Sequence, residues 1–439
     1  MIKKNIEISV VGVGYIGTVI SCALASENIN INGVDLDKEN VNLLNEGKTL
    51  ISEPGIDEKI EEIVKRGYFS CSSDFSSIKS SSVIIVTVGT PLSENLEADL
   101  TQVENVAMEI GKYISKGTLI CLKSTVIPGS TERFSEIISQ VSGLELGKDI
   151  HVAFSPERIA EGKALEEIRK FPIVIGSNNK ASSSLCSKFW KEALGVKTIE
   201  VTSFIAAELT KLADNLWIDS NIALANLISS LAYKLGANSN EIIDSANTLP
   251  KGSSYVNILR SSIGVGGSCL TKDPLFFANL LDDNGLDSSM VRNARKVNES
   301  MPSEYLNLVR RWLEEKNIKK PIVALIGLAF KSDTNDLRFT PMAEVYDSLK
   351  NDMSLKVHDP IVRKEDFENL VKERVNFLSL ENVMKNSHVI IFGCAHTSIT
   401  LEMIADHLPL MNKEKLIVDG RSGYPNLADI VGHTNYISI

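Results

Sequence analysis

One cysteine in this chain stands in surroundings that suit a reactive thiol. Cys269 belongs to the segment GVGGSCLTKDP at residues 264–274, where glycine and serine leave the sulfur room to meet a substrate. Lys272 can favour the thiolate, which is the nucleophilic form of cysteine. Asp273 and Pro274 are typical of the N-cap and the first residue of a helix. The pattern predicts a nucleophilic cysteine directly before a helix.

The other cysteines have no such neighbours. They are scattered through apolar segments, without C-x-x-C spacing and without the density of a disulfide framework. Cysteines of this kind usually act as small buried hydrophobic residues. We expect reduced, unreactive thiols of a cytosolic protein at Cys22, Cys71, Cys121, Cys186 and Cys394.

A glycine fingerprint for a dinucleotide lies near the N-terminus. Gly12, Gly14 and Gly17 form G-x-G-x-x-G between the apolar segments ISVV and TVISCALAS. Between a strand and a helix, such glycines let a pyrophosphate approach the helix N-terminus. Asp35 ends the next apolar segment, where a carboxylate binds a ribose diol and repels a 2′-phosphate, which favours NAD over NADP. Together with Cys269, this fingerprint suggests an oxidation through a covalent sulfur adduct. A glycine turn that only lets a helix pack closely is the weaker alternative.

Polar residues share one face of a predicted long helix at residues 203–235. This segment has no internal glycine or proline, and its apolar residues recur at helical spacing. Lys211 and Asn215 are four positions apart, and Glu208 is three positions before Lys211. The spacing alone leaves open whether these side chains line a site or form an ordinary solvated face.

Charged residues also follow several predicted strands, at the edge where open α/β sheets bind ligands. Glu157 and Arg158 end the segment SPER after the strand DIHVAF. Further along, Phe330 and Lys331 follow VALIGLA, and Arg421 follows LIV. Cations in these places suit phosphate oxygens. A helix-start turn with solvated charges is the alternative for SPER.

The bulk properties exclude several classes of protein. The chain has 439 residues and a formal net charge of −10 without a basic run, which argues against nucleic-acid binding. It has no run of about 18 apolar residues, and residues 1–4 lead directly into an apolar segment. We therefore expect neither a membrane span nor a signal peptide. The six histidines show no ligand spacing with cysteines or acids, so no metal site is expected.

Two series of short apolar segments predict two α/β units. The first begins at Ile6 and comprises IEISVVGVG, INGVDLD, SSVIIVTVG, GTLICLKST, DIHVAFSPE and FPIVIGS. The second follows a charged stretch after Met301 and comprises PIVALIGLAF, LKVHDP, SHVIIFGCAHT and KLIVDGR. All-apolar strands separated by helices indicate a parallel sheet covered on both faces. We expect an α/β fold with two Rossmann-like parallel-sheet domains joined by a long central helix.

With these motifs in this order, the chain resembles the nucleotide-sugar 6-dehydrogenases of the UDP-glucose and UDP-N-acetylmannosamine dehydrogenase family. The resemblance runs end to end through GVGYIG, LLNEGKTLISEPG, VGTP, STVIPG, SPER, GVGGSCLTKD, GLAFKSDTNDLR and DGR. It implies an NAD-binding Rossmann domain at residues 1–200, a central helical dimerisation region with the cysteine loop at 201–300, and a UDP-sugar-binding α/β domain at 301–439. It also implies that a primary alcohol on the sugar becomes a carboxylate while two NAD are reduced.

The resemblance implies roles for individual residues. Cys269 attacks the aldehyde left by the first hydride transfer, and the thiohemiacetal becomes a thioester that water releases. Lys211 and Asn215 orient the sugar hydroxyl and steady the oxyanion, while Asp273 pairs with that lysine. The implied catalytic residues are Cys269, Lys211, Asn215, Asp273 and Glu157. The implied NAD contacts are Gly12, Gly14, Tyr15, Ile16, Gly17, Asp35, Thr90, Thr125 and Arg338. The implied substrate contacts are Arg158, Ile159, Lys211, Asn215, Gly266, Phe330, Lys331 and Arg421.

The residues after Glu157 bear on the sugar. PER followed by AEG resembles the N-acetylhexosamine branch, whereas members that act on UDP-glucose usually have PEF. Arg158 can donate to an acetamido carbonyl, which favours UDP-N-acetylmannosamine or UDP-N-acetylglucosamine. Against this, no histidine precedes Cys269, and RFTP at residues 338–341 departs from the usual RESP or RNSP. UDP-glucose is the alternative substrate.

The resemblance also implies an oligomeric state and a location, and it bears on the two alternative functions. It implies a homodimer or higher homo-oligomer in the cytoplasm, with no nucleic-acid or membrane partner, whose product supplies surface polysaccharide or glycan precursors. A single-step alcohol dehydrogenase of related fold would not need Cys269. A non-catalytic protein that binds NAD and a UDP-sugar would have no chemical reason to keep the whole implied catalytic set.

Overall fold

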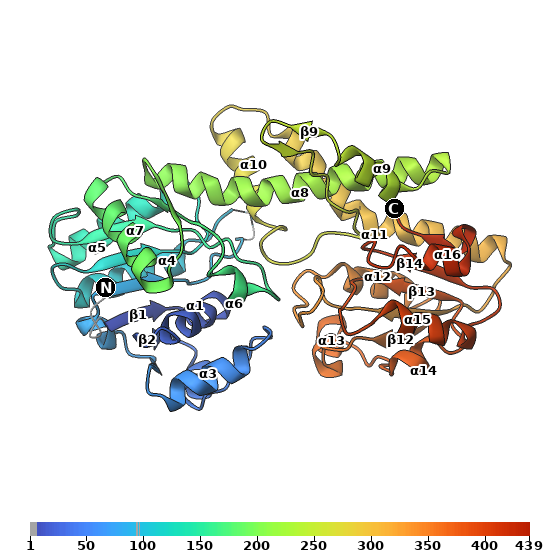
Figure 1. The fold of residues 1–439 in the computed structure, drawn as a ribbon, viewed down its shortest axis with the longest axis horizontal. Helices are drawn as coiled ribbons and strands as arrows, with labels where there is room; N and C mark the ends of the chain where they lie inside the picture. Colours follow the sequence, from blue (N-terminus) through green and yellow to red (C-terminus); the bar gives the residue numbers. More distant parts are fainter. Residues whose placement is uncertain (1–6, 94, 96) are drawn as a thin grey trace. The chain divides into compact units, whose positions relative to one another are not determined.

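The computed structural model describes residues 7–93, 95 and 97–439 (Figure 1). The expectations about residues 1–4 and Ile6 lie outside the described residues. The chain divides into two compact units, unit 1 at residues 1–214 and unit 2 at residues 215–439. The division falls within α8 (Phe204–Leu235), which confirms the long helix predicted at residues 203–235.

Unit 1 is built on a sheet that has eight strands within its described residues, in the order β3-β2-β1-β4-β5-β6-β7-β8. The strands are β1 (Glu7–Val11), β2 (Asn30–Val34), β3 (Phe69–Ser72), β4 (Val83–Val86), β5 (Leu119–Leu122), β6 (His151–Phe154), β7 (Ile173–Gly176) and β8 (Thr198–Val201). The first six follow the strand order of dinucleotide-binding Rossmann folds. They run parallel, with Val11 opposite both Val34 and Val86.

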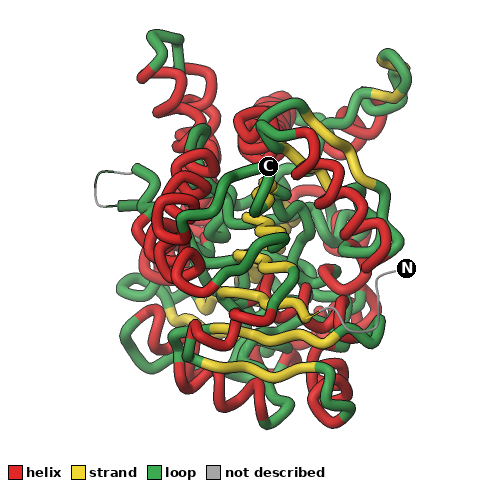
Figure 2. The backbone as a smooth tube through the Cα atoms, turned by 90° about the vertical axis from the view of Figure 1, so that its left-hand side faces the viewer, coloured by secondary structure: helices red, strands yellow, loops and turns green. Residues whose placement is uncertain are grey.

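Helices cover both faces of this sheet, as Figure 2 shows with the strands in yellow. They are α1 (Tyr15–Ala25), α2 (Lys38–Asn45), α3 (Ile56–Lys65), α4 (Thr101–Tyr113), α5 (Ser130–Ser142), α6 (Ala164–Glu167) and α7 (Lys180–Leu194). Along β4, Val83 and Ile85 pack in the same core as Val19 of α1, whereas Ile84 packs with Ile110 of α4. This alternation between two cores explains why the strand is apolar at every position.

The last part of the sheet differs from the prediction of a wholly parallel sheet. The strand predicted in FPIVIGS is β7, and it pairs antiparallel with β6 between Phe154 and Gly176. A parallel return requires a crossover of about a dozen residues, usually a helix. Between β6 and β7 the helix α6 has only four residues, so this connection lacks the long helix that usually carries a parallel crossover. The strands β3 and β8 were not predicted, because neither is a continuous apolar run.

Unit 2, all of whose residues are described, contains a five-stranded parallel sheet in the order β12-β11-β13-β14-β15. Its strands are β11 (Ile322–Ile326), β12 (Ser354–His358), β13 (Val389–Phe392), β14 (Leu416–Asp419) and β15 (Tyr436–Ile437). The helices that follow these strands are α12 (Pro341–Leu349), α13 (Lys364–Val371), α14 (Leu380–Met384), α15 (Leu401–His407) and α16 (Leu427–Val431). The predicted second α/β unit, and with it the predicted fold class, is confirmed.

The remainder of unit 2 is mainly helical. It comprises residues 215–235 of α8, α9 (Ser239–Ala246), the short hairpin of β9 (Pro250–Lys251) and β10 (Ser254–Tyr255), α10 (Asp273–Asp283) and α11 (Ser289–Glu315). The helix α11 continues through Pro302, so the expected domain boundary between residues 300 and 301 falls inside a helix. Within the described residues, no helix is both long enough and apolar enough to cross a membrane.

Candidate active site

The glycine fingerprint forms the turn between β1 and α1. Gly12 has φ +85°, a left-handed backbone that other residues rarely adopt. A Cβ on Gly17 would lie 2.1 Å from the carbonyl oxygen of Gly12, so the helix can pack on this turn only where it lacks a side chain. A Cβ on Gly14 would meet no atom within 4 Å, which leaves open space at the start of α1. This turn therefore fits the pyrophosphate of a dinucleotide.

Asp35 stands directly after β2 and is tied to the same turn. Its Oδ2 accepts the backbone N–H of Val13 at 2.8 Å, and its Oδ1 accepts the N–H of Asp37 at 3.0 Å. An ionised carboxylate held here can still accept ribose hydroxyls, because each oxygen has two lone pairs. Its charge repels a 2′-phosphate, which fits NAD.

The other cofactor residues predicted in unit 1 lie at adjacent positions of the sheet edge. Thr90 follows β4, and its Oγ1 donates to the carbonyl oxygen of Thr125, after β5, at 2.6 Å. Tyr15 and Ile16 are the first residues of α1 and are half-buried. Since β1 and β4 meet where the strand order reverses, this edge is the expected ligand crevice of the fold.

Glu157 is held on both oxygens by its own segment and by a buried lysine. Its Oε1 accepts the backbone N–H of Arg158 at 2.7 Å and of Ile159 at 3.0 Å. Its Oε2 lies 3.3 Å from Nζ of Lys123, which is 4% exposed and also donates to the carbonyl oxygen of Ser155 at 2.9 Å. The carboxylate thus shapes the turn after β6. Lys123 was not predicted, because a single lysine after the apolar segment LICL does not show which residues it will contact.

Arg158 lies on the same segment and pairs with α8. Its Nε donates to Oδ2 of Asp214 at 2.7 Å, and its Nη1 donates to the carbonyl oxygen of Pro172 at 3.4 Å. The side chain is 30% exposed. A guanidinium has five N–H donors, so donors remain for a ligand. The alternative of a freely solvated helix-start turn does not hold for SPER.

Glu208 does not share a site with Lys211 and Asn215, although its spacing along the helix suggested that it would. It is fully buried, and it accepts the N–H of Gly129 at 2.9 Å and both the N–H and the hydroxyl of Thr131, at 2.8 and 2.6 Å. It therefore satisfies the N-terminus of α5, a structural role. Lys211 and Asn215 are 9% and 6% exposed, which rules out a solvated face for them.

The cysteine loop ends at a contact that the resemblance did not imply, since the resemblance pairs Asp273 with Lys211. Nδ2 of Asn215 donates to Oδ2 of the fully buried Asp273 at 2.5 Å. Nζ of Lys272 lies 3.4 Å from the other oxygen of Asp273. Cys269 is exposed, and its carbonyl oxygen accepts the N–H of Asp273 at 2.9 Å. Lys272 is the N-cap of α10 and Asp273 its first residue, one position earlier than predicted, because Lys272 has αR geometry without a side-chain cap.

The glycines of this loop allow it to pack on the segment after β11. A Cβ on Gly266 would lie 2.5 Å from the carbonyl oxygen of Phe339 and 2.6 Å from Cβ of Phe330. Gly267 has φ +85°, and a Cβ there would lie 2.6 Å from the Phe330 ring. Its N–H donates to the carbonyl oxygen of Arg338 at 2.9 Å. The structure thus brings the thiol loop against residues predicted to bind the substrate and the cofactor.

A buried polar network on α8 and α11 supports the same loop. Nη1 of Arg295 donates to Oδ1 of Asp219 at 2.7 Å and to the carbonyl oxygen of Leu270 at 3.2 Å. Asn298 donates to the same Asp219 oxygen at 2.8 Å. Burial raises the pKa of Asp219, and Arg295 and Asn298 oppose that rise. These residues were not predicted, because the polar positions of α11 carry no motif.

Arg421 and Phe330 meet at the carboxyl edge of the second sheet. Nη2 of Arg421 donates to the carbonyl oxygen of Phe330. Its Nε is buried and has no hydrogen-bond partner in the part of the chain that the structure describes. A buried guanidinium N–H without a partner is costly, and a phosphate oxygen would satisfy it. Arg338 forms an ion pair with Asp336 on its own loop.

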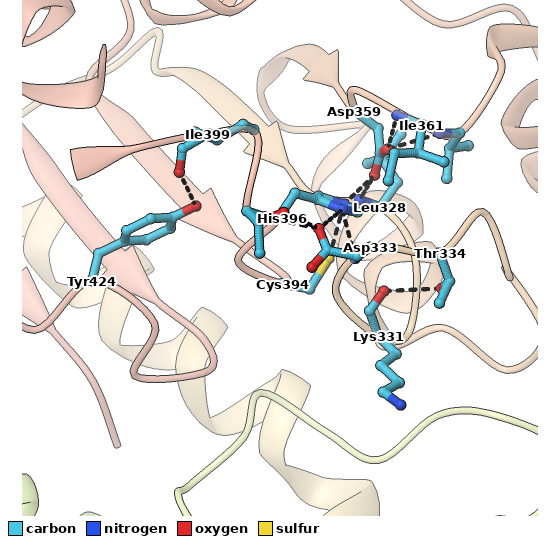
Figure 3. A network of polar contacts seen from close by, with 12 residues as sticks. Leu328, Lys331, Asp333, Thr334, Asp359, Ile361, Cys394, His396, Ile399 and Tyr424 are labelled. Carbon is cyan, nitrogen blue, oxygen red and sulfur yellow. Dashed lines mark hydrogen bonds and ion pairs between the residues drawn. The ribbon is translucent and has the colours of Figure 1, made fainter. Parts of the chain in front are cut away.

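A second polar network underlies the loop that carries Lys331 (Figure 3). Oδ2 of Asp359 accepts the N–H of Leu328 at 2.6 Å and lies 3.1 Å from Nε2 of His396. Nδ1 of His396 accepts the N–H of Asp333 at 3.0 Å. Burial alone would raise the pKa of Asp359, but the bonds from His396 and from the following backbone lower it. The network fixes the loop two residues from Lys331.

No group of three or more histidine, cysteine or carboxylate side chains suited to a metal ion occurs among the described residues.

Family comparison agrees with this arrangement. Residues 6–194 match the NAD binding domain of the UDP-glucose/GDP-mannose dehydrogenase family, residues 205–300 match its central domain, and residues 324–426 match its UDP binding domain. The expected NAD cofactor is thereby confirmed.

Individual relatives carry names of sugar-nucleotide dehydrogenases. The chain is 33% identical over 423 residues to the UDP-N-acetyl-D-mannosamine dehydrogenase of Pyrococcus horikoshii, and the match covers 95% of each chain. It is 32% identical over 351 residues to the NDP-N-acetyl-D-galactosaminuronic acid dehydrogenase of Ralstonia nicotianae, covering 78% of this chain and 79% of that one.

Solved structures show the same similarity. The structure of the UDP-D-ManNAc dehydrogenase from Pyrococcus horikoshii has a TM-score of 0.83 and 32% identity, with 95% of each chain covered. That of a UDP-glucose dehydrogenase from Pyrobaculum islandicum also has a TM-score of 0.83, with 26% identity over 96% of this chain and 95% of that one. The chain therefore belongs to the UDP-glucose/GDP-mannose dehydrogenase family and is an NAD-dependent UDP-sugar dehydrogenase.

Proposed function

We propose that this enzyme oxidises the primary alcohol of a UDP-N-acetylhexosamine, UDP-N-acetylmannosamine or UDP-N-acetylglucosamine, to the uronic acid. Each turnover consumes two NAD and one water and releases two NADH and three protons. The observation that carries the proposal is the exposed thiol of Cys269 beside the buried pair of Asn215 and Asp273. Oxidation of an alcohol to an aldehyde needs no thiol, whereas addition of a thiolate to the aldehyde creates the oxyanion from which a second hydride can leave.

The cofactor is held in unit 1 and the thiol in unit 2. Gly12, Gly14 and Gly17 leave room for the pyrophosphate, and Asp35 offers its carboxylate to the ribose. Bound NAD supplies the hydride acceptor for both oxidations. Lys211 takes part by accepting the hydroxyl proton in the first oxidation.

The second oxidation depends on sulfur. The thiolate of Cys269 adds to the aldehyde carbon, a C–S bond forms, and the carbonyl electron pair moves to oxygen. Loss of hydride from that carbon gives a thioester; water then adds, the C–S bond breaks and the thiolate leaves. One N–H of Asn215 Nδ2 is engaged by Asp273, which leaves the second to stabilise the oxyanion. Asp273 therefore positions Asn215.

Two features support an N-acetylated sugar. Arg158 keeps guanidinium donors beyond those used by Asp214 and Pro172, and these can bind an acetamido carbonyl. The relatives from Pyrococcus horikoshii and Ralstonia nicotianae are named for N-acetylated sugars. UDP-glucose is the second candidate, favoured by the similarity to the Pyrobaculum islandicum structure.

The test is the number of NADH formed per sugar nucleotide. UDP-N-acetylmannosamine, UDP-N-acetylglucosamine and UDP-glucose are each supplied in limiting amount with excess NAD. Two NADH from an N-acetylated sugar are expected. Two from UDP-glucose alone would move the assignment to that sugar. One NADH would indicate a simple alcohol dehydrogenase, and none would leave a non-catalytic binding protein.

We also propose that the enzyme is a homodimer formed through α8, in the three-part arrangement of domains expected from the sequence. Within unit 2, Trp217, Leu224 and Leu231 repeat every seven positions along α8 and are 48%, 47% and 59% exposed. An exposed stripe of this kind matches a helix-helix interface. The product is a uronic acid suited to surface polysaccharide or glycan synthesis. A reducing cytoplasm would keep Cys269 as a thiol.

A further inference from the structure

Glu53 is a buried carboxylate that the proposed chemistry does not use. It lies between α2 and α3 in the segment ISEPG and is 6% exposed. Its Oε2 accepts the phenol O–H of Tyr15 and the backbone N–H of Gly162, the latter at 2.6 Å. Its Oε1 accepts the N–H of Ala164 at 2.7 Å. One side chain thus joins three segments of unit 1.

The chemistry of these contacts makes the bridge specific. All three donors are neutral groups, and each gives its only hydrogen to the carboxylate. A buried carboxylate is stable only where such donors replace its hydration. Burial and the hydrogen bond to Glu53 both raise the pKa of Tyr15, so the phenol keeps the proton that it donates. A glutamine in place of Glu53 would turn an NH₂ group either towards Tyr15 and Gly162 or towards Ala164, and so would oppose a donor in both orientations.

The bridge connects the two parts of unit 1 that serve different ligands. Tyr15 is the first residue of α1 and directly follows Gly14 of the cofactor turn. Gly162 and Ala164 end the loop that begins with Glu157 and Arg158. The other end of this loop is fixed by Lys123, through its ion pair with Glu157.

The loop is also braced between its ends, so displacement at one end moves the whole segment. Oε2 of Glu167 accepts the N–H of Ala160 at 2.7 Å. Oε1 of Glu157 accepts the N–H groups of the two residues that follow it. With both ends and the middle held by carboxylates, residues 157–164 behave as one stiff unit rather than a free loop.

We propose that Glu53 transmits NAD binding at the glycine turn to the loop at residues 157–164, and so couples the affinity for NAD to the affinity for the sugar nucleotide. The link from NAD binding to the loop rests on the cofactor turn alone. The link from the loop to the affinity for the sugar nucleotide rests on the proposed function, which places Arg158 at the sugar. Glu53 is a positioning residue, because it acts through Tyr15 and the backbone of Gly162 and Ala164.

The test follows backbone hydrogen exchange of the loop in the full-length protein, with NAD alone as the probe. We compare wild type, Glu53→Gln, Tyr15→Phe and a matched control, Glu58→Gln, which alters an exposed carboxylate on the first turn of α3. NAD is supplied at saturation for each variant, as determined by calorimetry. In wild type and Glu58→Gln, NAD should slow exchange in the loop at residues 157–164 by about tenfold, a typical coupling between two sites.

In Glu53→Gln and Tyr15→Phe, saturating NAD should leave exchange of the loop within about twofold of the free protein. Full protection of the loop by NAD in both variants would overturn the proposal, as would a wild-type loop that NAD does not protect. Tyr15→Phe removes a single hydroxyl, so it decides the matter if Glu53→Gln fails to fold.

The affinity for UDP-N-acetylmannosamine, measured with and without NAD, tests the link between the loop and the sugar nucleotide. The ratio of the two affinities should fall towards one in Glu53→Gln and stay at the wild-type value in Glu58→Gln. Failure of the proposed function would be seen separately, as wild-type protein that forms no NADH from any of the three sugar nucleotides. The exchange measurement needs only NAD and is unaffected by that failure.

Discussion

Two cysteines of unit 2 have opposite surroundings. Cys394 lies at the end of β13 with its Sγ 3.2 Å from Nε2 of His396, which in turn lies 3.1 Å from Asp359. By residue type this is a nucleophile, a base and an orienting acid. Cys269 lies in a glycine-rich loop beside Lys272 and Asp273. Yet Cys394 is 1% exposed, whereas Cys269 is exposed.

The proton on His396 explains why the Cys394 arrangement is not a catalytic triad. Burial would lower the pKa of His396, whereas Asp359 and Cys394 raise it to about 10, which would protonate both nitrogens. However, Nδ1 accepts the N–H of Asp333 and cannot carry a proton while it does so. We therefore assign one proton, on Nε2, facing Asp359 and Cys394. His396 then has no lone pair to accept the thiol proton.

The comparison shows that a set of residue types does not identify a nucleophile. The hydrogen bonds of the Cys394 network hold three backbone N–H groups on two loops, those of Leu328, Asp333 and Ile361 (Figure 3). The surroundings of Cys269 instead leave a thiol at the surface and place the supporting carboxylate beneath it. Access and unused hydrogen-bonding capacity distinguish a reactive site from a structural one.

The largest expected effect is on catalysis. Cys269→Ser should lower formation of the uronic acid by about a thousandfold or more, because no thioester can form. Binding of the UDP-sugar, measured by calorimetry, should stay within about threefold of wild type. The matched control is Cys394→Ser, which should keep turnover within about twofold. Wild-type turnover by Cys269→Ser would remove the thioester mechanism.

Alkylation gives a second contrast between the two thiols. Iodoacetamide should modify Cys269 of the native protein and inactivate it, since the other five cysteines are buried. Mass spectrometry of the peptides identifies the site, and a saturating UDP-sugar should slow the reaction. Early modification of Cys394 would break the comparison. The alkylation rate at Cys394 should be at least about a hundredfold lower than at Cys269, since the reagent reaches a buried thiol only after local opening of the structure.

Removal of His396 should destabilise unit 2. His396→Leu deprives Asp359 of one donor and the N–H of Asp333 of its acceptor, which should lower the free energy of unfolding by about 3 kcal/mol. Asp359 has a lowered pKa in the folded state. The stabilisation of the fold by ionised Asp359 is therefore complete above its unfolded pKa of about 3.9 and is lost as the pH falls through its lower folded pKa. Urea unfolding should show the full difference at pH 7 and a smaller one below about pH 4.

The smallest effect concerns backbone strain in the two regions. Asp333, in the Cys394 network, has φ +61°, and Phe339, beside the thiol loop, has φ +53°. Aspartate tolerates this conformation, whereas an aromatic residue is strained in it. Phe339 is also 66% exposed. Phe339→Asn should raise the free energy of unfolding by about 0.5–1 kcal/mol, and the β-branched control Phe339→Val should lower it.

Much of the site could be predicted, because its elements are local. The fingerprint at Gly12, Gly14 and Gly17 is a turn between a strand and a helix, and the cysteine loop precedes a helix. Their backbone requirements are written in consecutive residues. The long helix and most of the strands followed from apolar spacing for the same reason. The catalytic and ligand roles of individual residues still rest on the resemblance and stay predictions.

Other features lay beyond sequence reasoning because their partners are distant in the chain. Glu53 meets Tyr15 across 38 positions and Gly162 across 109. Lys123 sits in an apolar segment, where only packing against Trp190 and Glu157 reveals its role. Spacing cannot report such contacts, since no local period relates the residues.

The sequence by itself determined the fold class and the identity of the exposed thiol, because hydrophobic period and glycine spacing act over a few residues. The family followed from the resemblance, which rests on the order of the motifs along the chain. Only the tertiary structure decided the direction of β7, the structural role of Glu208 and the network of His396 with Asp359. Each of these depends on which groups meet after the sheets form and on whether water reaches them. Those conditions arise from packing between distant segments, which a linear pattern does not encode.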